Sequence, residues 1–208
     1  MRTIQCLGLP NSPYFRVRAR AWWFAPVAVL SLTVHLAIGN RAVYADQSHT
    51  EDQVKAAYLF NFLKFVEWPG GAPEDPHGKW MIGVVGDSPV GGELKRLVEQ
   101  KTVGGRELVV QRFRATDDFR GCNVLFVSAS EEKHWPFILN VLQGSSVLTV
   151  ADMDNFISRG GMIQFVTEGD RVRVDIDVGA TSRARLKVSS KLLALAEAVT
   201  ETVRRAHN

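Results

Sequence analysis

The sequence predicts an α/β fold: a mixed sheet with helices on both faces, ending in a β-hairpin and a C-terminal helix. Two continuous apolar runs, residues 80–85 and 123–127, have the length and composition of buried strands. Segments with helix caps and helical spacing separate such runs, which favours strands covered on both faces. Residues 162–178 contain a Glu-Gly-Asp turn between two strand-like runs, and the second run alternates charged and apolar residues, as is typical near a sheet edge. An amphipathic helix is then predicted over about residues 189–206.

The other elements follow from caps, turns and apolar runs. A helix over about residues 49–68 starts at a Ser-x-x-Glu capping box and ends before Pro69, which disfavours helix at the preceding residue. A Gly-Asp-Ser-Pro turn after the first strand leads into a helix over residues 90–100. The later predicted elements are a strand at 108–113, a helix at about 128–143, a strand at 146–150 and a short helical turn at 152–158.

The segment from Val54 to Val66 is expected to lie at the centre of the core. Only Lys55, Asn61 and Lys64 are polar in it, and at about 100° per residue they fall at separate points around a helix. A helix that is apolar nearly all round must be covered on more than one side, and this one is shorter than the about 20 residues that span a bilayer. We therefore expect either a central core helix or a helix shared between the core and a partner.

Residues 1–45 have the pattern of a signal peptide. A basic stretch at 16–20 precedes an uncharged, mostly apolar run at 21–38, and Val-Tyr-Ala at 43–45 supplies small residues before a cleavage point. The alternative is an uncleaved anchor, because the apolar run approaches the length of a membrane span. Either way, we expect residues 46–208 to form a single exported domain.

Charge is distributed unevenly between these two parts. The chain has 25 Lys and Arg and 22 Asp and Glu, but five of the arginines and none of the acidic residues lie in residues 1–45. Residues 46–208 therefore carry 20 basic and 22 acidic residues, a net charge of −2. This balance gives no electrostatic reason to expect nucleic-acid binding.

The cysteines and histidines point away from redox and metal chemistry. Cys6 lies in the leader, so the exported domain keeps only Cys122 and cannot form an intrachain disulfide. Cys122 begins an apolar strand, so we predict a free, buried thiol, with a linker between two chains as the alternative. The histidines lack metal-ligand spacing and no nucleophile pairs with a base, so we predict no metal, no cofactor and no catalytic residues.

Two surfaces are candidates for binding. The loops Gly86-Asp87-Ser88 and Ser128-Ala129-Ser130 each follow a strand and precede a helix, where ligands bind in open α/β sheets, although helix capping also explains both loops. A basic group between the hairpin and the last helix is either a solvated connector or a contact surface for an acidic partner. The candidate contact residues are this group and the end of the first helix: Glu67, Trp68, Arg183, Arg185 and Lys187.

Five stretches of the chain form an ordered set that spans nearly all of residues 50–200. They are residues 54–69 (Val-Lys-Ala-Ala-Tyr-Leu through Phe-Val-Glu-Trp-Pro), 82–89 (Ile-Gly-Val-Val-Gly-Asp-Ser-Pro), 122–128 (Cys-Asn-Val-Leu-Phe-Val-Ser), 160–165 (Gly-Gly-Met-Ile-Gln-Phe) and 186–193 (Leu-Lys-Val-Ser-Ser-Lys-Leu-Leu). Together they resemble the YfiR-like family of exported regulators. No single motif is specific; the ordered set carries the resemblance.

The resemblance implies a periplasmic, non-enzymatic and often dimeric domain. It implies a negative regulator that binds the periplasmic part of an inner-membrane diguanylate cyclase and represses cyclic di-GMP signalling; release of the cyclase favours biofilm formation. Better-studied members carry intrachain disulfides that make them redox-responsive, whereas this chain keeps only Cys122 of that pattern. The alternative function is a periplasmic small-ligand-binding module for another membrane sensor. The resemblance also suggests that a second subunit or the signalling partner covers the exposed side of Phe60, Leu63 and Trp68.

Overall fold

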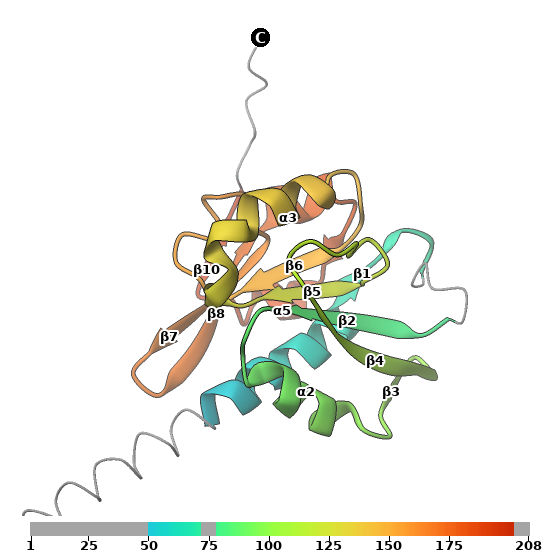
Figure 1. Cartoon of the computed structure of the whole chain (residues 1–208). Coiled ribbons are helices and arrows are strands. Elements are labelled where there is room, and N and C mark those ends of the chain that lie inside the picture. The colour runs from blue at the N-terminus through green and yellow to red at the C-terminus, as the bar shows by residue number, and fades with distance from the viewer. Residues whose placement is uncertain (1–49, 72–77, 202–208) are drawn as a thin grey trace, which may run out of the picture. The chain divides into compact units, whose positions relative to one another are not determined.

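The structure, a computed structural model, describes residues 50–71 and 78–201 (Figure 1). The predicted signal peptide lies outside the described residues, and so does Ser48 of the predicted capping box. Within the described ranges, no helix has both the length and the apolar composition needed to cross a membrane. In chain order the elements are the N-terminal helix (described over residues 50–65), β1 (Val66–Glu67), η1 (Pro69–Gly71), β2 (Trp80–Val85), α2 (Val90–Val98), β3 (Thr102–Val103), β4 (Arg106–Phe113), β5 (Val124–Val127), η2 (Ala129–His134), α3 (Trp135–Val141), β6 (Leu148–Ala151), β7 (Ile163–Glu168), β8 (Arg171–Asp177), α4 (Val178–Arg183), β9 (Lys187–Val188), α5 (Ser190–Leu193) and β10 (Ala198–Thr200).

The main sheet is mixed, which confirms the predicted fold class. In the described part of the chain it has eight strands in the order β10-β8-β7-β6-β5-β2-β4-β3. The pairs β10–β8, β7–β6, β6–β5, β5–β2 and β2–β4 are parallel, whereas the hairpins β7–β8 and β3–β4 are antiparallel. The half-exposed strand β8 lies second from the edge, with only the three-residue strand β10 outside it.

Two hydrophobic cores cover the two faces of this sheet. Side chains alternate along each strand, so Val84 packs on the same face as the N-terminal helix and α2, and its neighbour Val85 packs on the α3 face. Figure 1 shows the same layering, with α3 on one side of the sheet and α2 and the N-terminal helix on the other. The central strands β2, β5 and β6 are almost entirely buried, which explains their continuous apolar sequence.

The N-terminal helix is a core helix of this chain. The prediction that Phe60, Leu63 and Trp68 keep an exposed side for a second subunit or partner is wrong, because their exposed fractions are 8%, 3% and 8%. The sheet covers one side of the helix, and the segment that contains Leu186 and Leu192 packs into the same core. The ammonium of Lys64 also covers the Phe60 ring, with its Nζ 4.0 Å from the ring centroid.

The predicted last turn of this helix is replaced by a strand. The helix ends at Phe65, and Val66 and Glu67 pair with Val188 and Lys187 in the two-stranded sheet β1–β9. The Ser189 N–H continues this ladder by donating to the Phe65 carbonyl at 2.9 Å. A β-branched residue close to a proline favours this extended ending.

The C-terminal part departs furthest from the prediction. A C-terminal helix is present, but α5 is a single turn capped by Ser189. The predicted continuation toward residue 206 is wrong for residues 194–201, the last ones that the structure describes. Instead, β10 adds to β8, where the Glu197 N–H donates to the Val174 carbonyl at 2.9 Å. Helix α4 was not predicted; Asp177 caps it by accepting from the Ala180 N–H at 3.0 Å.

Candidate functional site

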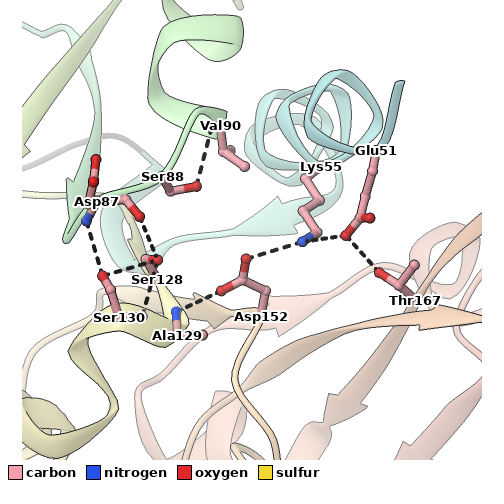
Figure 2. A network of polar contacts seen from close by, with 10 residues as sticks. All are labelled: Glu51, Lys55, Asp87, Ser88, Val90, Ser128, Ala129, Ser130, Asp152 and Thr167. Carbon is pink, nitrogen blue, oxygen red and sulfur yellow. Dashed lines mark hydrogen bonds and ion pairs between the residues drawn. The ribbon is translucent and has the colours of Figure 1, made fainter. Parts of the chain in front are cut away.

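The carboxyl ends of the central parallel strands bring several polar segments together. The loops after β2 and β5 meet there, and Asp152 follows β6 directly. Figure 2 shows these segments with the start of the N-terminal helix beside them. The structure therefore places the two predicted ligand loops at one edge, as expected for an open α/β sheet.

The two loops bind each other rather than leaving their polar groups free. The Asp87 N–H donates to Ser130 Oγ at 3.0 Å, and the Ser128 hydroxyl donates to the Asp87 carbonyl at 3.2 Å. Gly86 has φ +94°, and a Cβ there would lie 2.6 Å from both Ser130 Oγ and Glu131 Cγ. The loops are packed tightly at this point, so their hydroxyls serve to join β2 to β5 and to cap η2.

Lys55 links the N-terminal helix to this edge of the sheet. Its side chain is 8% exposed, and its Nζ lies 2.7 Å from Glu51 Oε1 and 3.1 Å from Asp152 Oδ2 (Figure 2). The other oxygen of Asp152 accepts from the Ala129 N–H at 2.8 Å, and Glu51 accepts from the Thr167 hydroxyl at 2.9 Å. One buried cation thus connects the helix to the segments after β5 and β6 and to the hairpin.

The electrostatics of this network favour the charged forms of Lys55 and Glu51. Burial alone lowers the pKa of the Lys55 ammonium, but the hydrogen bonds and attraction from Glu51 and Asp152 outweigh it and hold that pKa above its usual value. Burial raises the pKa of Glu51, but hydrogen bonds from Lys55 and Thr167 outweigh it, so this pKa lies below its usual value. The neighbouring Asp52 has a raised pKa, mainly because of burial.

The sequence pattern did not predict this network; it marks Lys55 only as one of three polar residues in a nearly all-apolar helix. The available signal was a lysine inside a nearly all-apolar helix, since a buried charge requires a partner. The identity of Asp152, 97 residues away, follows only from the fold. Because every polar atom named above already has a protein partner, the network is suited to fixing the helix on the sheet rather than to chemistry on a substrate.

Among the predicted contact residues, the structure brings Glu67 and Lys187 together. They are directly opposite each other in the antiparallel pair β1–β9, and both side chains are exposed. Trp68 is different: its ring packs edge-on against Trp80, with centroids 5.2 Å apart, and it is buried. Trp68 therefore fixes the end of the N-terminal helix and does not offer its ring to a partner in this structure.

Arg183 and Arg185 lie around a different feature, a groove of about 420 Å³ between the end of α3 and α4. Arg183 lines it, and Arg185 donates from Nη2 to the carbonyl of the lining residue Gly144 at 3.4 Å. The side chain of Arg183 is 40% exposed, and its Nη2 lies 3.9 Å from the buried Asp177 Oδ2. Arg159 also lines this groove, and the described lining residues include no acidic side chain.

Cys122 is a free, buried thiol two residues before β5, within the core on the α3 face. Burial raises its pKa to about 12, so the thiol is protonated at neutral pH. The described residues contain no group of three or more potential metal ligands among His, Cys, Asp and Glu.

Comparison with known proteins identifies a family and, among solved structures, a distant likeness. Residues 52–197 match the model of the family described as YfiR/HmsC-like. A solved structure of an ABC domain in complex with L-Trp from Streptococcus pneumoniae is 9% identical in sequence, with a TM-score of 0.48. The likeness covers 69% of this chain and 60% of that chain, and at this level it does not inform the function.

Proposed function

Because this chain belongs to the YfiR/HmsC-like family of periplasmic regulators of cyclic di-GMP signalling, we propose that it represses an inner-membrane diguanylate cyclase by binding its periplasmic part. The observation that carries the proposal is the family match over residues 52–197, which runs from the N-terminal helix almost to β10. The proposal includes export by the leader in residues 1–45. It gives the protein a binding role without catalysis, which is consistent with the structural use of the loop hydroxyls at the sheet edge.

The contact surface in this proposal consists of Arg183, Arg185, Lys187 and Glu67. The three basic side chains are exposed, whereas the intervening Ala184 and Leu186 are buried. This alternation anchors the segment to the core and holds its cations at the surface. Three exposed cations on an anchored segment favour an acidic partner surface, because attraction between opposite charges contributes specificity and speeds association.

A binding measurement between the purified protein and the periplasmic part of the cyclase tests this assignment. We expect Arg183→Glu and Lys187→Glu each to weaken binding by about tenfold or more, because like charges then face each other. Lys133→Glu, an exposed charge reversal on η2, is the matched control and should bind as the wild type does. Equal loss of affinity in all three variants would argue against this surface, and so would an unaffected Arg183→Glu.

A second candidate function is a small-ligand-binding module for another membrane sensor, and the groove lined by Arg183 supports it. Its volume of about 420 Å³ is within the range of about 300–1,000 Å³ typical of ligand pockets. The predicted site at the 86–88 and 128–130 loops is less suitable, because these loops are packed against each other. Thermal-shift screening with amino acids and small anions tests this function; no shift at millimolar ligand would count against it.

A further inference from the structure

The groove lined by Arg183 combines cations with apolar walls. It lies between the end of α3, β6 and α4, and its volume of about 420 Å³ suits a small organic molecule rather than a single inorganic ion. Six side chains form its apolar lining: Leu139, Leu142, Val147, Met162, Ala180 and Ala184. Among the described lining residues, the charged ones are Arg159 and Arg183. A ligand that fits both parts has an apolar body and a negative charge.

Arg159 is held in a fixed position at this groove. Its Nη1 donates to Glu132 Oε1 at 2.8 Å, its Nη2 donates to the Glu132 carbonyl at 3.0 Å, and its own carbonyl accepts from the Trp135 indole N–H at 3.1 Å. A guanidinium has five N–H donors, so further donors remain after these bonds. The Arg159 side chain is 31% exposed, so it is preorganised to donate to a planar anion such as a carboxylate.

Thr149 adds a buried hydroxyl to the same lining. This residue is 2% exposed, and its oxygen accepts from the Met162 N–H at 3.2 Å. A threonine hydroxyl can also donate one hydrogen bond, so its proton remains available for an acceptor in the groove. The polar part of the lining therefore offers donors, and these favour a group that only accepts hydrogen bonds, as an ionised carboxylate does.

The charges around the groove also favour an anion. Glu132 and Asp177 pair with Arg159 and Arg183, but neither carboxylate lines the groove. Arg185 lies at the edge of the groove, where its Nη2 donates to the Gly144 carbonyl at 3.4 Å. A cleft lined by one sign of charge attracts ligands of the opposite sign.

The apolar walls indicate the kind of body that the ligand has. They consist of aliphatic side chains and Met162, and the described lining residues include no aromatic ring that could stack on a ligand. We propose that this groove binds a medium-chain aliphatic carboxylate, with the carboxylate at Arg159 and Arg183 and the alkyl chain along the apolar walls. This inference rests on the second candidate function, because it names the ligand class for the same groove.

Calorimetric titration of the purified, exported protein with straight-chain carboxylates tests the proposal. We expect the affinity to rise about tenfold for every two carbons from butyrate through hexanoate to octanoate, because each buried CH₂ contributes about fourfold. Hexanol has the same chain length as hexanoate but no charge. It should bind at least about tenfold more weakly, because it lacks the charge-assisted hydrogen bonds to the guanidinium groups.

Substitutions of the arginines locate the bound carboxylate. Arg159→Gln and Arg183→Gln should each weaken hexanoate binding about tenfold, since each removes a charged donor. Arg171→Gln removes the same charge from an exposed position at the start of β8 and should bind hexanoate as the wild type does. Arg159→Lys keeps the charge but loses the planar fork, so it should retain part of the affinity; it replaces Arg159→Gln if that variant does not fold.

Three results would overturn the proposal: equal affinity for hexanoate and hexanol, equal weakening by Arg171→Gln and Arg159→Gln, or no saturable binding of octanoate up to about 10 mM. If these carboxylates fail to bind but another compound from the thermal-shift screen does, the ligand class is wrong and the second candidate function stands. The cyclase takes no part in this titration, so failure here leaves the proposed repression of the cyclase to its own test.

Discussion

Replacing Lys55 with methionine removes the cation that joins Glu51 of the N-terminal helix to Asp152 at the sheet edge. Methionine keeps most of the apolar stem, so the core contacts of the side chain are largely preserved. Glu51 and Asp152 then lose a partner at 2.7 and 3.1 Å, and their carboxylates remain close to Asp52. The variant therefore isolates the electrostatic part of the contact.

The expected loss of stability follows from burial. Removing one partner of a fully buried pair costs about 3–5 kcal/mol, because the other charge is left uncompensated. Here the side chains of Glu51 and Asp152 keep 34% and 18% exposure, so water offsets part of the cost. We expect a loss of about 2–3 kcal/mol in the free energy of unfolding at pH 7, and a fall of about 4–10 °C in Tm.

The pH dependence distinguishes the ion pair from simple packing. The pKa of Glu51 is lowered in the folded protein, so its contribution is present above the usual value of 4.5 and is lost as the pH falls through the folded pKa. The pKa of Lys55 is raised, so its contribution is present below the usual 10.5 and is lost as the pH rises through the folded pKa. The difference between wild type and Lys55→Met should therefore stay nearly constant from pH 7 to about 4.5 and shrink as the pH is lowered further.

Urea unfolding at several pH values provides the measurement. Lys64→Met is the matched control, because Lys64 is exposed on the same helix and its hydrogen bond to Asn61 is at the surface; its cost should stay below about 1 kcal/mol. A Lys55→Met variant as stable as the wild type would refute the reasoning. A loss that does not shrink as the pH falls below about 4.5 would attribute the effect to packing instead.

Two further predictions concern the core. Gly161→Ala should destabilise the domain by about 3 kcal/mol or more, because the added Cβ would lie 2.2 Å from the Phe156 ring. Gly92→Ala in α2 should instead stabilise the domain by up to about 1 kcal/mol, because the added Cβ meets nothing within 4 Å and alanine favours a helix over glycine. Equal Tm values for the two variants would contradict the packing argument. The Cys122 thiol, with its pKa raised to about 12, should react with a thiol reagent at pH 8 only as fast as the protein unfolds; rapid labelling of the folded protein would contradict its burial.

The parts of the fold that were predictable are those that local sequence determines. The runs that became β2 and β5 are apolar because both faces of these strands are covered, and this pattern is visible without a structure. The helix predicted after α5 is absent because pairing with β8 decides the conformation of this segment, although its apolar residues suit a helix locally. Tertiary pairing overrides local propensity in such a short segment.

The candidate sites were less predictable, because they depend on partners far apart in the chain. Glu67 and Lys187 were both selected, but their pairing arises from a two-residue strand with no distinct sequence signal. Trp68 was selected as a contact because it precedes a loop, and only the structure shows that Trp80 covers its ring. The partner of Lys55 is equally invisible in the sequence, since Asp152 lies in a turn of ordinary composition.

Cyclic di-GMP levels in cells that lack this protein test the proposed function most directly. Deletion should raise cyclic di-GMP, and the wild-type protein should return it to the original level when expressed from a plasmid. The Arg183→Glu variant should be exported and folded but should fail to lower cyclic di-GMP. Unchanged cyclic di-GMP on deletion, in cells shown to produce the protein, would contradict its assignment as a repressor of a diguanylate cyclase.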